Sequence, residues 1–254
     1  MTAQTDLNTY DLVVGGETVA ADSGGYFETV DPATEEPLAK VARARKPDIE
    51  RAVSAATDAH EGWSSTAPQE RGRLLSDLAE RIRANQERLA LLETRDNGKP
   101  LSHARSDVET CARYFEYYAG VADKLHGDSI PLTDDYVDYT VREPLGVTAQ
   151  IIPWNLPTNI FGRSVAPALA TGNTAVVKPA EQTPLTAVEI GKLAAEVGLP
   201  EGVLNVVPGF GEEAGAPLAE HPGVDGVSFT GSVPTGIEVG TAAVENLTNV
   251  HLEL

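Results

Sequence analysis

The sequence predicts an α/β protein in which a parallel sheet with flanking helices is preceded by an amino-terminal helical region and β-hairpins. From residue 146 onward, short apolar runs alternate with helical patterns. Such alternation with short loops gives right-handed crossovers and a parallel sheet that is covered on both faces. We therefore divide the chain into an amino-terminal region, 1–145, which forms part of the same domain, and a Rossmann-like region, 146–254.

The amino-terminal region begins with short β patterns and continues with helices. Asp11–Val14 followed by Gly15 and Gly16 predicts a hairpin. Proline is favoured in the first turn of a helix, and it opens one helix at Pro47 and a longer one at Pro68. The remaining expected elements are the end of this helical region at Asn97-Gly98, an amphipathic helix over His103–Leu125 and an exposed strand over Tyr136–Arg142.

The second region carries five expected strands and four expected helices. The strands are expected at 147–152, 173–178, 203–207, 224–230 and 248–254. Helical patterns occupy 158–170, 185–197, 211–220 and 234–245. Sheets of this type bind ligands beyond the carboxyl ends of their strands, so the loops that follow the strands are the first places to look for a site.

The net charge narrows the classes of partner. Nineteen Lys and Arg against thirty-eight Asp and Glu give a formal charge of −19. This charge repels nucleic-acid phosphates and anionic lipid, so we expect no nucleic-acid partner and no membrane partner. The sequence also has no run of about 18 apolar residues that could span a bilayer.

Composition also suggests an origin and a compartment. From Pro179 to Leu254, eleven acidic residues face one basic residue, Lys192, and such a self-repelling surface gains from screening by salt. We interpret this acidic composition as that of a protein from a halophile. The alternative is an ordinary acidic cytoplasmic protein. One cysteine, Cys111, cannot form an internal disulfide, and Met1–Tyr10 lacks the pattern of a secretory signal. We expect a cytoplasmic protein.

Two glycine-rich loops follow predicted strands. Gly209-Phe-Gly211 with Gly215 follows one strand, and Gly231-Ser232 with Gly236 follows the next. Glycine allows backbone N–H groups to approach a pyrophosphate closely, and a following helix offers its positive end. Neither loop fits G-x-G-x-x-G, so a tight turn without a ligand stays open as the alternative for each.

Polar side chains follow two of the other strands. Lys178 and Glu181 fix a cation and an anion just outside the sheet, where they could hydrogen-bond ribose hydroxyls, although a surface ion pair explains them equally well. The amide of Asn155 could stabilise an oxyanion, and a simple turn asparagine is the alternative.

Two other kinds of site are disfavoured. The five histidines have no ligand spacing and one cysteine cannot build a thiolate zinc site, so we expect no metal. Gly162-Arg-Ser164 is similar to part of a nucleophile elbow, but Ala166 replaces the second glycine and the surroundings are helical. A serine hydrolase is therefore not favoured.

Several motifs together resemble the NAD(P)-dependent aldehyde dehydrogenase family in order and spacing. They are IIPWNLP (151–157), KPAEQTPL (178–185), NVVPGFG (205–211), FTGSVPTG (229–236) and the closing LEL (252–254), with DNGKP (96–100) and EPLGV (143–147) upstream. The resemblance covers nearly the whole chain and implies the amino-terminal, cofactor-binding half of such an enzyme.

The resemblance also implies roles for particular residues. Asn155 would donate to the oxyanion, and Glu253 would activate the water that hydrolyses a cysteine thioester. The residues implied to bind NAD, with NADP as a possible substitute, are Ile152, Pro153, Trp154, Asn155, Lys178, Glu181, Gly211, Glu212, Gly231 and Ser232. A ribose hydroxyl suits the Glu181 carboxylate better than a 2'-phosphate does, so we expect a modest preference for NAD.

The nucleophile is the missing part. In the family a cysteine thiolate attacks the aldehyde, and it follows the Leu-Glu-Leu strand on a separate catalytic domain. Cys111 lies far upstream in an amphipathic helix without the motif of the nucleophile, so we expect it to be a small buried or half-buried residue. The chain is thus expected to be inactive alone and to regain activity with a matching carboxyl-terminal half; the partners expected are a small-molecule aldehyde and such a half or a homo-oligomer. The alternative is a nucleotide-binding or interaction module without turnover.

Overall fold

A seven-stranded sheet forms the centre of the protein in the computed structural model, which describes residues 7–254. Its order is β12-β11-β8-β9-β10-β2-β3, and the five strands from β12 to β10 pair in parallel. These five are β8 (Val147–Ile152), β9 (Thr174–Pro179), β10 (Leu204–Val206), β11 (Gly226–Thr230) and β12 (Asn249–Glu253). The expected parallel core of the sheet is confirmed.

The amino-terminal hairpin joins this sheet and makes it mixed. β2 (Leu12–Val14) and β3 (Glu17–Val19) are joined by Gly15 and Gly16, whose φ values of 62° and 79° fit a tight hairpin turn. β2 pairs antiparallel with β10, and the Gly15 N–H donates to Asn205 Oδ1 at 2.9 Å. The parallel core is therefore extended at one edge by an antiparallel hairpin. A second sheet contains β1 (Asn8–Tyr10), β4 (Tyr26–Asp31) and β5 (Glu36–Ala42).

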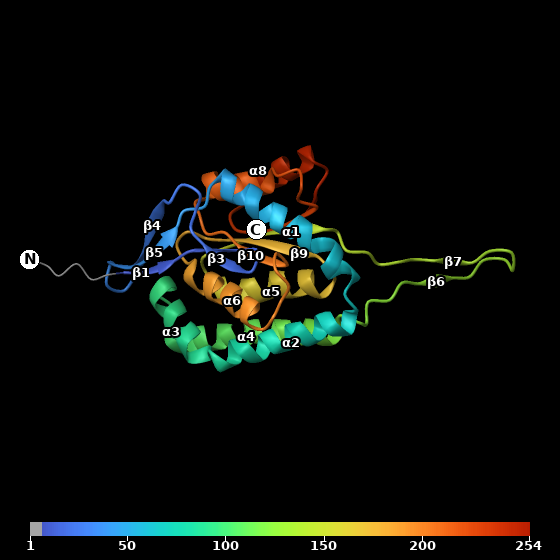
Figure 1. Cartoon of the computed structure of the whole chain (residues 1–254), viewed down its shortest axis with the longest axis horizontal. Coiled ribbons are helices and arrows are strands. Elements are labelled where there is room, and N and C mark those ends of the chain that lie inside the picture. Colours follow the sequence, from blue (N-terminus) through green and yellow to red (C-terminus); the bar gives the residue numbers. More distant parts are fainter. Residues whose placement is uncertain (1–6) are drawn as a thin grey trace, which may run out of the picture.

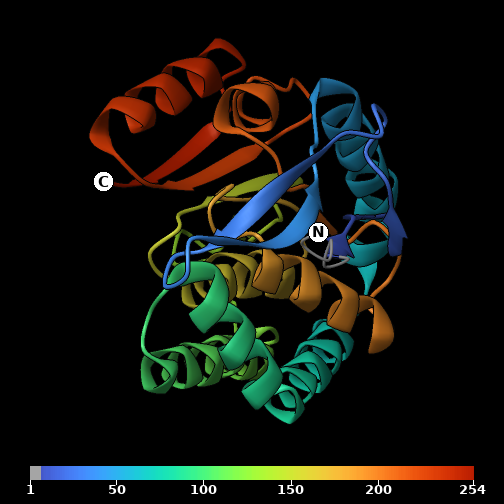
Figure 2. The same cartoon turned by 90° about the vertical axis from the view of Figure 1, so that its left-hand side faces the viewer.

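Helices cover both faces of the large sheet (Figure 1). One face carries α5 (Pro157–Ala170) and α6 (Leu185–Glu196), and the other carries α1 (Lys46–Ser65), α7 (Ala216–Ala219) and α8 (Val233–Glu245). An outer layer, green to cyan in Figure 2, packs on α5 and α6 and contains α2 (Pro68–Ala84), α3 (Gln86–Asn97) and α4 (Leu101–Val121).

The strand β9 shows why both faces are covered. Ala175 and Val177 belong to the core on the α5 face, whereas Val176 between them belongs to the core on the α1 face. Successive side chains of a strand point to opposite faces, so an uninterrupted apolar run needs cover on both sides. The position of β9 inside the sheet therefore follows from its sequence.

Two expected elements differ from the structure. The helix expected over 211–220 is a π-helical turn, Gly211–Gly215, followed by the four-residue α7. Pro217 lacks an N–H and cannot extend a regular helical ladder there. Of the strand expected over Tyr136–Arg142, only β7 (Asp138–Tyr139) forms, paired with β6 (Ser129–Ile130).

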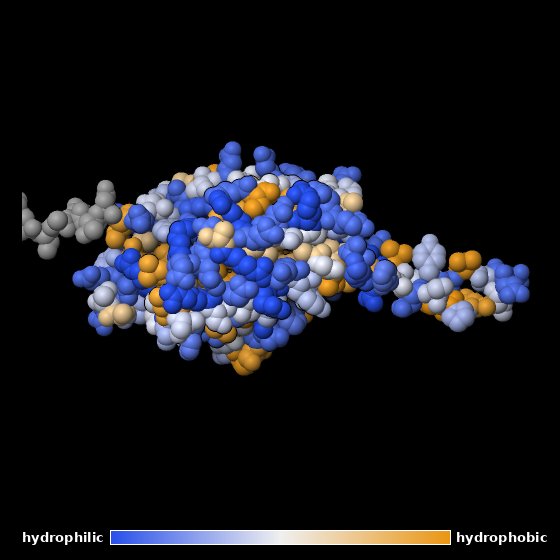
Figure 3. Space-filling model, turned by 90° about the horizontal axis from the view of Figure 1, so that it is seen from below, coloured by the Kyte–Doolittle hydropathy of each residue, from blue (hydrophilic) through white to orange (hydrophobic). Residues whose placement is uncertain are grey.

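That pair lies in a hairpin that projects from the body of the protein, where no neighbouring layer supports a longer strand (Figure 1). Figure 3 shows apolar side chains on this projection, and Ile130, Leu132 and Val137 are exposed. In residues 7–254, no helix has the length and apolar character needed to cross a membrane. Residues 1–6, part of the segment expected to lack a secretory signal, lie outside the described residues.

Candidate functional site

The order of the strands creates a switch point in the sheet. From β8 the chain adds β9 and β10 on one side and then crosses to place β11 on the other side of β8. A cavity of about 980 Å³ lies at the carboxyl ends of these strands, where open α/β sheets bind ligands. Its lining includes every site residue expected from the sequence: Ile152, Pro153, Trp154, Asn155, Lys178, Glu181, Gly211, Glu212, Gly231, Ser232 and Glu253.

A buried ion pair occupies one wall of this cavity. Lys178 Nζ lies 3.0 Å from Glu181 Oε2, and Lys178 is only 4% exposed. Burial lowers the pKa of Lys178, while the Glu181 carboxylate opposes that shift. Burial would raise the pKa of Glu181, but the charge of Lys178 and hydrogen bonds outweigh it and the net pKa is lowered. The pair is therefore part of a cavity wall rather than of the open surface.

The loop after β8 presents Trp154 and Asn155. Trp154 is 59% exposed and Asn155 is also exposed. Asn155 Oδ1 accepts the N–H of Leu156, the residue that precedes α5, at 3.0 Å. With its oxygen used in this local turn, the polar group that Asn155 offers to a ligand is its Nδ2 donor.

The two glycines singled out in the loops play different structural parts. A Cβ on Gly231 would lie 2.5 Å from the Phe229 ring, so packing alone requires glycine there. No atom lies within 4 Å of the Cβ position of Gly211, which leaves that side of the loop open. The sequence predicts a helix after Gly211 whose positive end would face a ligand. A π turn and a four-residue helix follow Gly211 instead, and these are too short to supply a substantial helix dipole.

A longer helix does begin at the other glycine loop. Ser232 is the N-cap of the thirteen-residue α8, and its Oγ accepts the N–H of Thr235 at 3.4 Å. Both residues line the cavity. The positive end of α8 therefore faces the same space as the Lys178–Glu181 pair.

Glu253 lies at the end of β12, in register with Thr230 of β11. Its Oε2 lies 3.8 Å from Arg163 Nη1, and its Oε1 lies 3.2 Å from His251 Nε2. Arg163 also donates from Nη2 to Thr230 Oγ1 at 3.1 Å. The guanidinium thus spans the ends of two neighbouring strands, and 44% of the Glu253 side chain remains accessible.

The cavity as a whole is acidic. Five carboxylates line it, against one basic side chain, Lys178. The carboxylates belong to Glu181, Glu212, Glu220, Glu238 and Glu253. An anionic ligand therefore meets local repulsion that salt would screen.

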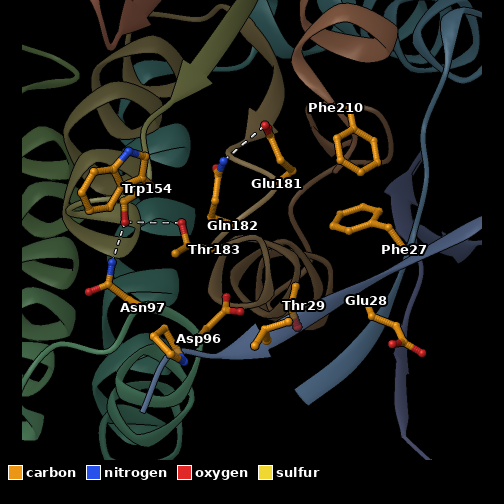
Figure 4. Close-up of a pocket in the computed structure, with 12 residues that line it drawn as sticks. Phe27, Glu28, Thr29, Asp96, Asn97, Trp154, Glu181, Gln182, Thr183 and Phe210 are labelled. Atoms are coloured by element: carbon orange, nitrogen blue, oxygen red, sulfur yellow. Dashed lines mark hydrogen bonds between the residues drawn. The ribbon is translucent and has the colours of Figure 1, made fainter. Parts of the chain in front are cut away.

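A smaller cavity of about 530 Å³ shares Trp154 and Glu181 with the first (Figure 4). Asp96 in its wall accepts the Leu185 N–H through Oδ2 at 3.0 Å, and burial raises the pKa of this carboxyl to about 8. Among the described residues, Asp96 Oδ1 and Thr29 Oγ1 have no hydrogen-bond partner. The motif DNGKP contains Asp96 and Asn97, but nothing local in the sequence indicates that they reach these loops.

Sequence reasoning also gave no role to three residues in or beside the main cavity. Thr230 and Arg163 contact each other beside Glu253, and Glu238 adds charge from α8. Arg163 was noticed only as part of Gly162-Arg-Ser164. That tripeptide lies inside α5, and Gly162 is small because a Cβ there would lie 2.8 Å from Cys111 Cα.

Cys111 is fully buried on α4, as expected. Burial raises the pKa of its thiol, which keeps it protonated and unreactive. Within residues 7–254, no group of three or more His, Cys, Asp or Glu is arranged to hold a metal ion.

Comparisons with known proteins agree with the geometry. The profile described as "Aldehyde dehydrogenase family" matches residues 18–254. Aldehyde dehydrogenase family 2 member B4, mitochondrial, from Arabidopsis thaliana is 51% identical over 96% of this chain and 46% of its own length. The NADP/NAD-dependent aldehyde dehydrogenase PuuC of Escherichia coli is 45% identical over 95% of this chain and 50% of its own.

A solved structure gives the same result for the fold. The NAD+ complex of an aldehyde dehydrogenase from Bacillus cereus superposes with a TM-score of 0.96 at 45% identity, covering 97% of this chain and 51% of that one. The chain spans about half the length of the relatives it matches. On the profile match, the strand order and these likenesses, the chain belongs to the aldehyde dehydrogenase family.

Proposed function

We propose that this chain provides the dinucleotide-binding half of an NAD-dependent aldehyde dehydrogenase, which oxidises a small-molecule aldehyde to a carboxylic acid. The observation that carries the proposal is the convergence of four strand-end loops on one cavity with a buried Lys178–Glu181 pair. The division into 1–145 and 146–254 belongs to this proposal, because β8–β12 and the loops between them form most of the cavity.

The chemistry of the cavity suits a dinucleotide. Lys178 and Glu181 offer a donor and an acceptor, which is the combination that the hydroxyls of a ribose need. Gly211 has open space beside it, and the first turn of α8 offers polar groups at Ser232. We assign the ribose to the ion pair and the pyrophosphate to Gly231 and Ser232. NAD is the proposed cofactor, with NADP accepted less well.

When bound, NAD would supply the hydride acceptor of the oxidation. The roles of this chain's own residues are to orient the substrate oxygen and to move a proton. Asn155 Nδ2 is proposed to donate to the developing oxyanion, and Glu253 to take a proton from the hydrolytic water. Neither residue can form the covalent bond to the aldehyde, so the nucleophile must come from outside these 254 residues.

A second candidate is a nucleotide-binding module that takes part in no turnover. It is supported by the burial of Cys111, the single cysteine of the sequence, which leaves the cavity without a thiol nucleophile of its own. Under this alternative the cavity still binds NAD, but no aldehyde is oxidised even when a cysteine-bearing half is supplied.

Co-expression with a carboxyl-terminal half that carries a cysteine nucleophile separates the two candidates. NADH formation by the pair but not by either half supports the dehydrogenase. In the pair, Glu253→Gln is expected to slow thioester hydrolysis, and Cys111→Ser is the control that should leave turnover unchanged. NADH formation by this chain alone, abolished by Cys111→Ser, would contradict both candidates.

The same proposal includes an origin and a compartment. The excess of carboxylates supports a halophilic origin. The single, buried cysteine supports a cytoplasmic location. A partner half or a second copy is the proposed macromolecular contact, which exposed apolar residues such as Val137 and Ile237 support. Nucleic acid and membrane are not among the proposed partners because of the net charge of −19.

A further inference from the structure

The segment Asp96–Lys99 approaches the loop that carries Asn155, although more than fifty residues separate them in sequence. Asn97 Nδ2 donates to the backbone carbonyl oxygen of Trp154 at 2.6 Å. Thr183 Oγ1 donates to the same oxygen at 3.4 Å. Figure 4 shows the two side chains reaching this oxygen from different elements.

The carbonyl that they hold belongs to the peptide unit between Trp154 and Asn155. A peptide unit is planar, so fixing its oxygen also fixes the direction of the Asn155 N–H and restricts the Asn155 Cα. Both residues of this peptide are exposed at the cavity. Asn97 therefore restrains a loop that has little packing of its own.

Asn97 can act in this way because its own backbone is firmly held. It is the last residue of α3, and Gly98 after it adopts a φ of 84° against Pro32. On one side, Asp96 Oδ2 accepts the Leu185 N–H at 3.0 Å at the start of α6. The segment is thus anchored to a second helix immediately before Asn97.

Lys99 anchors the segment on the other side. Its Nζ donates to Glu93 Oε1 at 2.6 Å and to Asp107 Oδ2 at 2.7 Å, and it is largely buried. Asp107 Oδ1 in turn accepts from Asn159 Nδ2 at 3.2 Å, in the first turn of α5. The same network therefore holds the helix that begins just after Asn155.

We infer that Asn97 is a positioning residue for the Trp154–Asn155 peptide and so for the oxyanion donor of the reaction. The inference rests on the proposed function for its catalytic meaning. Asn97 touches neither substrate nor cofactor in this assignment and acts through the loop. The motif DNGKP then does more than end α3, because its asparagine also holds the loop after β8.

The test compares Asn97→Asp, which keeps the shape but lacks the N–H donor, with Asn97→Ala and with Asn85→Ala. Asn85 is the matched control because its Nδ2 also donates to a backbone carbonyl, that of Arg81, at 2.9 Å but away from the cavity. The readouts on the full 254-residue chain are the NMR signals of the Trp154 indole and the Asn155 backbone and side-chain amides, assigned with Trp154→Phe and Asn155→Asp. Calorimetric titration with NAD is the second readout.

Both Asn97 variants should shift or broaden the Trp154 and Asn155 signals and leave the buried Trp63 indole signal in place, whereas Asn85→Ala should change neither tryptophan. In the co-expressed enzyme, the two Asn97 variants should lower kcat by about tenfold and change KM for NAD by no more than about twofold. This loss of kcat is smaller than the loss expected when an oxyanion donor itself is deleted. Unchanged Trp154 and Asn155 signals in Asn97→Asp would overturn the inference. A wild-type chain that binds no NAD would overturn the proposed function, while the loop signals would still decide whether Asn97 holds the peptide.

Discussion

Lys178 Nζ lies 3.0 Å from Glu181 Oε2 at the carboxyl edge of the sheet, with the lysine almost completely buried and the glutamate partly accessible. A buried ammonium is costly unless it is paired, and Glu181 compensates this cost. Glu181 also lines the cavity. One residue thus stabilises the lysine and remains available to a ligand.

Glu181→Gln should therefore weaken the discrimination between NAD and NADP. The glutamine removes the charge that repels a 2'-phosphate but keeps an oxygen that accepts a hydrogen bond. We expect the ratio of the two dissociation constants, measured by calorimetry at matched salt, to move toward NADP by about tenfold, which corresponds to about 1.4 kcal/mol of relieved charge repulsion. A wild-type chain that binds NADP more tightly than NAD would contradict this account.

Gly231→Ala and Gly211→Ala should differ in their effect on stability. A methyl group on Gly231 meets the Phe229 ring at 2.5 Å, so we expect a loss of about 1–3 kcal/mol in the free energy of unfolding. A methyl group on Gly211 enters open space, and the change should stay within about 0.5 kcal/mol. Urea denaturation measures both values, and equal losses would show that the packing argument is wrong.

Asp96→Asn should change how stability depends on pH. The raised pKa of about 8 in the folded state, against an ordinary value of 3.8, means that the folded chain keeps a proton that the unfolded chain has lost. The free energy of unfolding should then fall as pH rises from about 4 to about 8 and level off above that. Asparagine can still accept the Leu185 N–H but does not titrate.

The comparison of unfolding curves for the wild type and Asp96→Asn at pH 5, 7 and 9 measures this effect. As pH rises, the free energy of unfolding of the variant should increase relative to that of the wild type, by an amount on the order of a few kcal/mol. A constant difference across this range would show that Asp96 does not hold a proton in the folded chain.

Salt should raise both stability and affinity for NAD. The Debye length falls from about 10 Å at 0.1 M salt to about 3 Å at 1 M, which screens the repulsion among the carboxylates. Five carboxylates and one lysine line the cavity, so the binding of an anionic dinucleotide should tighten with chloride rather than weaken. A melting temperature and a dissociation constant that both stay flat between 0.1 and 1 M chloride would contradict the halophilic interpretation.

The sequence was most informative where structure is local. The runs that became β8 and β9 are short, mostly apolar and bounded by turns, so their existence as buried strands could be predicted. The loops after them could be placed at one edge because parallel strands end together. Motif resemblance then singled out residues that the structure gathers on one cavity.

Long-range pairing was less accessible to sequence reasoning. The attachment of β2 to β10 depends on a three-residue strand and one register pair, which no local pattern encodes. The contact of Asn97 with Trp154 and that of Arg163 with Glu253 join segments far apart in the chain. The break after Gly215 could have been anticipated from Pro217, whose missing N–H interrupts a helix.

The most direct test of the central claim is calorimetric titration of the 254-residue chain with NAD at high salt, for wild type, Lys178→Ala and Lys192→Ala. Lys192 is the matched control because it forms an equivalent pair three residues apart, with Glu189 at 2.9 Å, outside the cavity. Wild type and Lys192→Ala should bind one NAD with equal affinity, and Lys178→Ala should bind at least about tenfold more weakly. No binding by the wild type at millimolar NAD, or equal weakening by the two lysine variants, would contradict the assignment of this cavity to the cofactor.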